Sequence, residues 1–408
     1  MPMTHEQLDH STVSTRARNR RPRRIAAATT TIAVATIMLA AACAPTPSGP
    51  TPTAPPGPPT VSNFRLVAQR SAAPVVGALR FNVADPNNDV LTCRIDSDGD
   101  GAMDVTLTPC RSSDSVMVEF PTPDALTLTI EVDDGESAPV GASLDLDIEA
   151  PPAETFEITL RLDPGMDPVF QAAFDDAAQR WSQVITTGVP DMALDLPGGL
   201  VGWNPPFNGV VDDVLIDARA TNIDGPGQVL GSAGGIFVRS GHWQPYYGIM
   251  EFDSADLANL ADSGRLGSVI LHEMGHVLGI GVSWALTAKI EDPLVNPSYK
   301  GQTAVTAWHE LGGSGYVPVE NQGGAGTALG HWRESTFTNE LMTGWLGSGP
   351  TPLSRLTIAS LADQGYGVSL GAASPYTLAG PAMRAFGAPE PESQLHTQLI
   401  PPMLGGLP

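Results

Sequence analysis

The chain has 408 residues, 42% of them hydrophobic, and a formal net charge of -23 at pH 7. This length is sufficient for two or three domains with hydrophobic cores, and the composition does not indicate global disorder. Because the acidic excess repels phosphate backbones and anionic headgroups, we expect no nucleic-acid partner.

Residues 1–42 have the pattern of an export signal. Six arginines between Arg16 and Arg24 precede an uncharged apolar run from Ile25 to Ala42. The sequence "MLAAAC" resembles a bacterial lipobox, in which the cysteine, here Cys43, becomes the lipid-modified new N-terminus. Ala40 departs from that motif, which usually has a larger aliphatic residue there. The resemblance implies a cell-surface lipoprotein or an extracellular protein, held to the membrane by its lipid; an uncleaved anchor helix is the alternative.

The next two segments predict a tether and a β-sandwich. Residues 43–60 are rich in Pro and Thr, which favours an extended, semi-rigid linker. Residues 61–150 contain short alternating runs such as "LRFNV", "VMVEF" and "LTLTIEV", broken by turn residues, which predicts a sandwich. The pattern resembles PKD-like or cadherin-like immunoglobulin-type modules. With Cys43 carrying lipid, Cys93 and Cys110 are left as a candidate disulfide outside the cytoplasm.

An acidic loop lies between these two cysteines. In "DSDGDGAMD", Asp96, Asp98, Asp100 and Asp104 alternate with other residues in the manner of a calcium loop. Position twelve of such a loop would be a bidentate glutamate, but it is Leu107 here. The loop is therefore either a weaker Ca²⁺-stabilised turn or a merely acidic hairpin.

Residues 151–368 predict an α+β domain. "FEITLRL" alternates as a strand, and Asp167 and Pro168 mark the start of a helix with apolar residues at helical spacing. The runs "DDVLIDA", "GIFV" and "GIMEF" predict further strands, and Asp253 and Asp256 are expected at the N-terminus of a helix. The expected order is one strand, a long helix, several strands and a second helix. Residues 369–408, rich in Ala and Pro, are expected to form a poorly ordered tail.

The stretch "VILHEMGHVLGIG" carries the strongest chemical signal. On a helix, positions i and i+4 lie about 40° apart around the axis, so His272 and His276 can reach one ion. Neutral imidazoles suit Zn²⁺, and a third protein ligand would leave a fourth position for water. Glu273 is then placed to act as a general base toward that water.

A third histidine is missing from the position that the short metal-binding pattern gives it. In the pattern H-E-x-x-H-x-x-G-x-x-H, Gly279 matches the glycine, but Val282 occupies the position of the third histidine. Outside the signal segment and the motif, the histidines that we do not expect to bind zinc are His242, His309 and His396.

From Phe156 to Val368 the chain resembles the leishmanolysin family of metzincin endopeptidases, in which a long insertion separates the glycine from the third histidine. The stretches that carry the resemblance are "HEMGHVLGIG", "VPVEN", "GHW", "NELMTG" and "LTIASLADQGY". It implies His272, His276 and His331 as zinc ligands, Glu273 as the base and Met342 as the Met-turn residue. Glycine runs in the insertion, Tyr299 to Gly330, permit the chain to return to the site.

Two departures from the family are visible. No cysteine remains to block the zinc in a pro-segment, and the disulfides that brace the catalytic domain of eukaryotic members are absent from this sequence, which has three cysteines. A site of another class, with a glutamate as third ligand, is disfavoured by Gly279 and the Met-turn; its candidates are Glu291, Glu310 and Glu340.

The sequence thus predicts an exported zinc endopeptidase acting on protein or peptide substrates. The alternative is a surface adhesion or scaffold protein that keeps the protease fold without activity. The complete set of His272, Glu273, His276, His331 and Met342 favours the enzyme.

Overall fold

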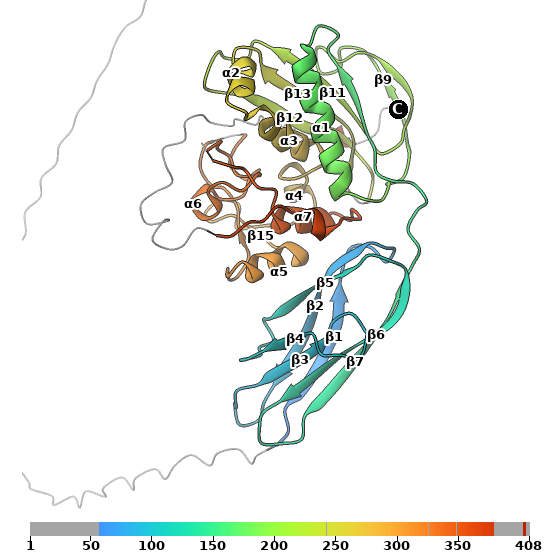
Figure 1. Cartoon of the computed structure of the whole chain (residues 1–408), viewed down its shortest axis with the longest axis vertical. Helices are drawn as coiled ribbons and strands as arrows, with labels where there is room; N and C mark the ends of the chain where they lie inside the picture. The colour runs from blue at the N-terminus through green and yellow to red at the C-terminus, as the bar shows by residue number, and fades with distance from the viewer. Residues whose placement is uncertain (1–56, 242, 325, 348, 379–402, 405–408) are drawn as a thin grey trace, which may run out of the picture. The chain divides into compact units, whose positions relative to one another are not determined.

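A computed structural model describes residues 57–378 and 403–404, except 242, 325 and 348 (Figure 1). The export signal, Cys43, most of the tether, His242 and His396 lie outside the described residues.

The N-terminal described segment forms two antiparallel sheets. One has the order β1-β2-β5 and the other β4-β3-β6-β7. The strands are β1 (Thr60–Val67), β2 (Val75–Ala84), β3 (Thr92–Asp96), β4 (Val105–Leu107), β5 (Ser115–Phe120), β6 (Asp124–Asp133) and β7 (Val140–Ile148). Alternate residues of β5 and β6 are buried, as expected for strands with one face on a core. Both sheets contribute to one hydrophobic cluster that includes Leu79, Ile95, Val118 and Ile130.

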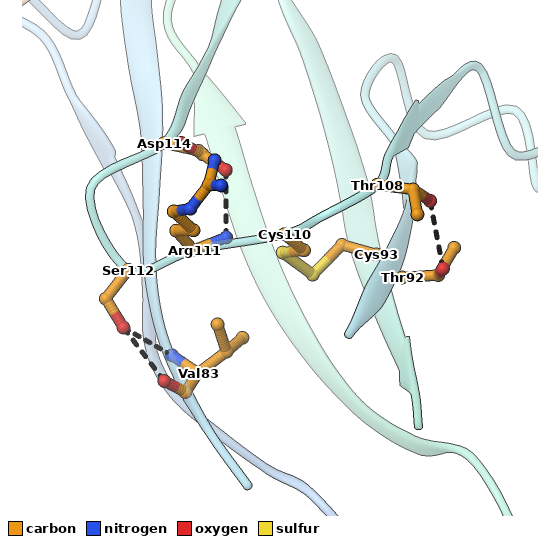
Figure 2. Close-up of a disulfide and its surroundings, with 8 residues drawn as sticks. All are labelled: Val83, Thr92, Cys93, Thr108, Cys110, Arg111, Ser112 and Asp114. Atoms are coloured by element: carbon orange, nitrogen blue, oxygen red, sulfur yellow. Dashed lines mark hydrogen bonds between the residues drawn. A yellow bond between two sulfur atoms is a disulfide. The ribbon is translucent and has the colours of Figure 1, made fainter. Parts of the chain in front are cut away.

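A disulfide joins Cys93 of β3 to Cys110, across a sequence separation of 17 residues (Figure 2). Both cysteines are buried in the cluster between the sheets. The segment that follows Cys110 is held to β2, because the Ser112 hydroxyl accepts a hydrogen bond from Val83 N at 2.9 Å. The disulfide therefore closes the segment between β3 and β5, which contains β4 and the acidic loop that precedes it.

The second part of the chain is built on a mixed sheet with the order β17-β12-β13-β11-β8. Strands β8, β11 and β13 are parallel neighbours, whereas β12 runs antiparallel to β13. The strands are β8 (Ile158–Leu162), β11 (Val214–Thr221), β12 (Gly231–Val238), β13 (Pro245–Asp253) and the short β17 (Met403–Leu404). The three parallel strands contain the predicted runs "ITLRL", "VLIDA" and "GIMEF".

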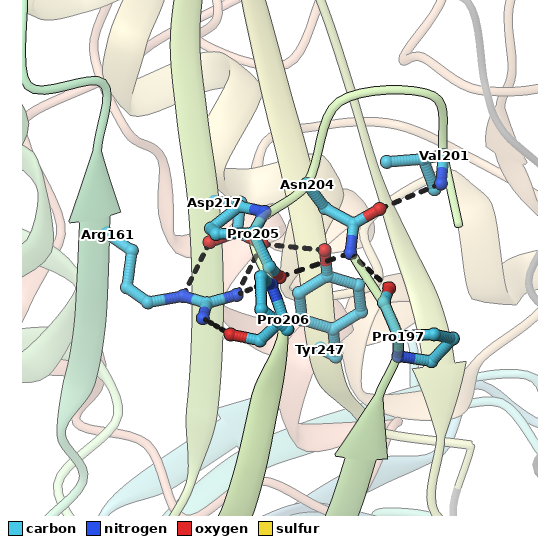
Figure 3. A network of polar contacts seen from close by, with 8 residues as sticks. All are labelled: Arg161, Pro197, Val201, Asn204, Pro205, Pro206, Asp217 and Tyr247. Atoms are coloured by element: carbon cyan, nitrogen blue, oxygen red, sulfur yellow. Dashed lines mark hydrogen bonds and ion pairs between the residues drawn. The ribbon is translucent and has the colours of Figure 1, made fainter. Parts of the chain in front are cut away.

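A buried ion pair ties the three parallel strands together (Figure 3). Arg161 of β8 donates from Nε and Nη2 to the two carboxylate oxygens of Asp217 on β11, each at 2.7 Å. The hydroxyl of Tyr247 on β13 donates to Asp217 Oδ2, also at 2.7 Å. Because Asp217 is completely buried, this bidentate pairing satisfies a charge that would otherwise be costly to bury.

Two helices, α1 (Pro168–Val184) and α3 (Leu266–Val277), pack beside each other and share one hydrophobic cluster with the sheet (Figure 1). The Asp167 side chain accepts from Val169 N and Pro168 is in the first turn of α1, as the sequence predicts. The buried face of α1 consists of Phe174, Ala177, Trp181 and Val184. Trp181 Nε1 donates to the carbonyl of Leu271 at 3.0 Å, which fixes α1 against α3.

The predicted N-cap position is confirmed for Asp256 and wrong for Asp253. Asp253 ends β13, and its carboxylate accepts hydrogen bonds from loop amides that include Ile223 N and Gly225 N. Asp256 occupies the N-cap position of α2 (Leu257–Asp262), but its side chain accepts from Gly227 N and makes no cap bond. Backbone amides of the loop before β12 donate to both carboxylates in place of the helix amides. The local sequence pattern does not show that these amides lie nearby.

After α3 the chain forms short helices and strands that pack on the same hydrophobic core. They are α4 (Val282–Leu286), β14 (Ile290–Glu291), β15 (Ser298–Tyr299), α5 (Gln302–Glu310), β16 (Val317–Pro318), α6 (Glu334–Phe337), α7 (Arg355–Ala362) and η1 (Leu370–Ala372). Ser354 caps α7 as predicted, since its side chain accepts from Thr357 N. The packed chain continues past Val368, because Leu370, Tyr376 and Leu378 contact the core.

Two further features were not foreseen. β9 (Met192–Leu196) and β10 (Phe207–Val211) form a separate antiparallel hairpin. Among the described residues, the window Leu266–Leu286 is long and apolar enough to cross a membrane, with a mean hydropathy of 1.3. However, 83% of this window is buried within the protein, as is usual for a core helix.

Candidate metal centre

The helix α3 presents two histidines and a glutamate in the interior of the domain. His272, Glu273 and His276 are each at most 1% exposed. Val269 and Ile270, one turn earlier, are completely buried and anchor the helix in the core. The i and i+4 spacing places both imidazoles on one side of α3, with their ring centroids 4.7 Å apart.

The third histidine arrives from the far end of the insertion. His331 follows β16 and precedes α6, and it is completely buried. The three Nε2 atoms lie 3.0 Å (His272–His276), 3.1 Å (His276–His331) and 3.2 Å (His272–His331) apart. Nitrogens held about 2.0–2.1 Å from one tetrahedral Zn²⁺ would be about 3.3 Å apart, so the spacing fits that ion.

Each histidine is oriented through its other ring nitrogen. Nδ1 of His272 lies 2.6 Å from the carbonyl oxygen of Leu341. Nδ1 of His276 lies 2.8 Å from Ile280 O, and Nδ1 of His331 lies 2.8 Å from Thr327 O. A carbonyl can only accept, so each Nδ1 carries the proton and each Nε2 presents a lone pair to the other two. Three converging lone pairs are stable together when a cation lies between them.

Burial sets the protonation of the site. Burial lowers the pKa of His272 to about 4. It also lowers the pKa of His276 well below its ordinary value, and the charges of His272 and His331 lower that pKa further. Burial also raises the pKa of Glu273 well above its usual range. Both carboxylate oxygens of Glu273 are buried and accept no hydrogen bond from the described residues. Burying a carboxylate without hydrogen-bond partners costs free energy of folding, and groups of this kind are typically found at functional sites.

Two glycines shape the end of the motif. Gly279 has φ +104° and Gly281 has φ +76°, conformations that favour glycine. A Cβ atom on Gly281 would lie 2.1 Å from the carbonyl oxygen of Gly330, the residue before His331. The backbone just after the motif is therefore in direct contact with the residue that precedes His331. Val282, where the short pattern would have its third histidine, begins α4 instead.

Met342 packs against the helix that carries two of the histidines. It is completely buried, and a Cβ atom on Gly275 of α3 would approach its sulfur to 3.0 Å. The backbone of Met342 is held on both sides, since its N–H donates to Glu340 Oε2 at 2.6 Å and its carbonyl accepts from Trp332 N at 2.9 Å. The turn that contains Met342 is thus attached to the residue that follows His331.

The glutamates of the alternative ligand set have other partners. Glu291 Oε2 accepts from Lys300 Nζ at 2.8 Å, and Glu310 Oε2 lies 3.9 Å from Arg355 Nη2. Glu340 is buried, but its oxygens are engaged by Met342, Ser354 and Thr357. His309 is on α5, where its Nε2 is 2.9 Å from Gly315 O.

The acidic loop of the sandwich is only partly assembled as a cation site. Ligand atoms of Asp96, Asp98 and Asp104 lie within 4.8 Å of one another, whereas Asp100 is not in this group. Asp96 already accepts from Gly99 N and Gly101 N, as an acidic turn does without an ion. Calcium there stays a prediction.

Sequence reasoning missed the backbone supports. The carbonyls of Ile280, Thr327 and Leu341 that orient the rings leave no signature in side-chain identity. Glu340 was weighed only as a ligand, although its position two residues before Met342 marked it as part of the same turn.

Residues 237–375 match the family model described as leishmanolysin, Peptidase_M8. This match contains all three histidines, Glu273 and Met342. A leishmanolysin of Leishmania donovani is 32% identical over 133 residues, which are 30% of this chain and 22% of that protein. A leishmanolysin-like peptidase of Caenorhabditis briggsae is 50% identical over 48 residues, 12% of this chain and 7% of that protein. The chain therefore spans about a fifth or less of the length of these relatives.

Two solved structures are similar to part of the chain at low scores. The PKD domain of human VPS10 domain-containing receptor SorCS2 has a TM-score of 0.21 and 13% identity, covering 25% of this chain and 81% of that one. The PKD domain of an M14-like peptidase from a Thermoplasmatales archaeon has a TM-score of 0.19 and 18% identity, covering 23% and 95%. The immunoglobulin-type likeness of the sandwich stays a prediction.

Proposed function

We propose that this protein is a zinc-dependent endopeptidase of the leishmanolysin type, with His272, His276 and His331 as ligands. The observation that carries the proposal is the convergence of three Nε2 atoms within 3.2 Å, each ring being fixed by a backbone carbonyl. The partial match to the leishmanolysin family supports the same conclusion.

Zinc held by these histidines would supply Lewis acidity, which polarises a peptide carbonyl and lowers the pKa of water toward about 7. Glu273 acts as the general base: its carboxylate takes a proton from the attacking water and later gives it to the leaving amine. The absence of hydrogen-bond partners among the described residues leaves both Glu273 oxygens available for this transfer. Met342 supports the site through its contact with α3.

The setting that we propose is outside the cytoplasm. The basic and apolar N-terminal sequence and Cys43 favour export and lipid attachment. The disulfide between Cys93 and Cys110 supports an oxidising compartment, where such bonds persist. The sandwich would then be a module between the anchor and the peptidase, and proteins or peptides would be the substrates.

The test is the zinc content and the hydrolysis of casein by the chain beginning at residue 57, compared with two variants. We expect Glu273→Ala to retain zinc and to lose hydrolysis by at least about 10²-fold, because only the base is removed. Glu291→Ala, at an exposed position of β14, should keep both properties. A wild-type protein without zinc, or a Glu273→Ala variant as active as wild type, would refute the proposal. A protein that binds zinc but does not hydrolyse any substrate would instead support the inactive scaffold.

A further inference from the structure

Glu340 is a buried carboxylate with an unusually full set of donors. It is 1% exposed and lies between α6 and the Met342 turn. Its Oε2 accepts from Met342 N at 2.6 Å. Its Oε1 accepts from Ser354 Oγ at 2.6 Å, Ser354 N at 3.1 Å and Thr357 Oγ1 at 2.6 Å.

These four donors are neutral, and no cation pairs with Glu340 in the described part of the chain. Burial raises its pKa, whereas the hydrogen bonds from Ser354, Thr357 and Met342 lower it. A buried carboxylate is retained at a cost in free energy unless its hydrogen bonds compensate. Its placement therefore calls for a structural or functional reason.

One arm of the network leads to His272. The N–H of Met342 and the carbonyl of Leu341 belong to the same planar peptide unit. Glu340 Oε2 holds the N–H of this peptide, and the carbonyl accepts from His272 Nδ1 at 2.6 Å. Fixing one end of a rigid peptide plane fixes the direction of the other. Glu340 thereby sets the orientation of the carbonyl that aims the His272 ring.

A second arm leads to the neighbour of His331. Thr357 Oγ1 donates to Glu340 Oε1 and accepts from Trp332 Nε1 at 2.8 Å. Trp332 is completely buried and directly follows His331, and its backbone N–H donates to Met342 O at 2.9 Å. The indole and the backbone of Trp332 are thus both tied to the turn that Glu340 organises.

We propose that Glu340 is a positioning residue of the metal centre, which holds the Leu341–Met342 peptide and Trp332 so that His272 and His331 converge on one point. This inference rests on the proposed zinc site but not on hydrolysis. Glu340 does not touch the ion or the substrate, and it acts through the Leu341 carbonyl and the Trp332 side chain.

Asp253 offers a matched control for a variant of Glu340. It is completely buried, and its carboxylate also accepts from four neutral donors, which are the amides of Ile223, Asp224, Gly225 and Ala255. None of these residues supports a histidine of the site. Asp253→Asn and Glu340→Gln therefore make the same chemical change at two buried carboxylates that each accept four hydrogen bonds.

The experiment measures the Kd for zinc by competition with a chelator, and the thermal midpoint of each metal-free protein. We expect Glu340→Gln to weaken zinc binding by about 10–100-fold, the range for partners that orient ligands, and Asp253→Asn to leave it within about twofold. Both variants should lower the thermal midpoint. The absorption of the cobalt-substituted proteins should change for Glu340→Gln alone, because ligand geometry is altered.

Equal zinc affinity in Glu340→Gln and Asp253→Asn would overturn the inference. If Glu340→Gln does not fold, Thr357→Val serves in its place, since it cuts the link between Glu340 and Trp332 with little change in volume. An unchanged zinc affinity in that variant would overturn the inference equally. Failure of the wild-type protein to bind zinc would refute the proposed function, whereas zinc binding without hydrolysis leaves this comparison fully measurable.

Discussion

Gly275 lies directly against Met342, so that a side chain at Gly275 would be in tight contact with the sulfur. A Cβ atom at Gly275 would lie 3.0 Å from both Met342 Sδ and Trp181 Cζ2. The close approach of the metal-binding helix to the Met342 turn therefore depends on the absence of a side chain at this position.

Gly275→Ala should consequently reduce the free energy of unfolding by about 1–3 kcal/mol, the usual cost of overpacking. Gly267 of the same helix is the matched control, because a Cβ there would meet nothing within 4 Å. Gly267→Ala should stabilise the protein by up to about 1 kcal/mol through helix propensity. Chemical denaturation of both variants measures the difference, and equal effects would contradict the packing argument.

His331→Ala should weaken zinc binding by more than about 100-fold, because it removes one of three ligands that share the ion. His309→Ala is the control, since His309 is outside the cluster and bonds only to the Gly315 carbonyl among the described residues. Zinc dissociation constants from chelator competition give the comparison. Full retention of zinc by His331→Ala would remove His331 from the ligand set.

The disulfide should contribute about 3 kcal/mol to the stability of the sandwich, given the 17-residue separation that it closes. The double variant Cys93→Ala/Cys110→Ala should unfold at a lower temperature in calorimetry, and a reducing agent should have the same effect on wild type. The reducing agent should leave the double variant unchanged, which separates the bond from other effects. Zinc affinity should stay constant throughout.

Glu334 should make stability depend on pH. Burial raises its pKa to about 7, a hydrogen bond from Thr343 lowers it, and the charge of Glu320 raises it. Because the folded value exceeds the ordinary value of 4.5, this stabilising contribution is complete below pH 4.5 and is lost as the pH rises through 7. Glu334→Gln should gain on the order of 1–3 kcal/mol over wild type at pH 8.5 and little at pH 5.

Thermal melts of Glu334→Gln across this range test the prediction. Glu291→Gln, at an exposed position, should show no comparable change between the two pH values. A difference between Glu334→Gln and wild type that does not vary with pH would show that packing, rather than charge, governs the effect.

Much of the candidate site was accessible from the sequence because its geometry is local. The four-residue spacing of His272 and His276 determines their common face on a helix, and Gly279 signals a turn that only a residue without a side chain adopts easily. His331 was different. Its assignment came from a family resemblance, because no local rule connects residues 55 positions apart in the chain.

The remainder depends on tertiary contacts that local patterns do not encode. Asp253 looked like a helix cap, but loop amides thirty positions earlier compete for its carboxylate. The β9–β10 hairpin was missed because its strands are joined by a long loop and pair only with each other among the described strands. Glu340 is a candidate ligand by sequence, but in the structure its carboxylate accepts four hydrogen bonds and supports the turn next to the site.

The contact between Gly281 and Gly330 brings together the two ends of the segment that joins the motif to His331. Because both ends of this segment are fixed at one point, a change of length in its exposed stretch 291–296 does not redirect either end. Its buried residues, such as Trp284 and Tyr299, belong to the core and are not free to vary in this way. His276 and His331 can therefore stay close in space whatever number of residues separates them in the chain. Insertions or deletions in the exposed stretch 291–296 should therefore be tolerated as long as the two glycines meet.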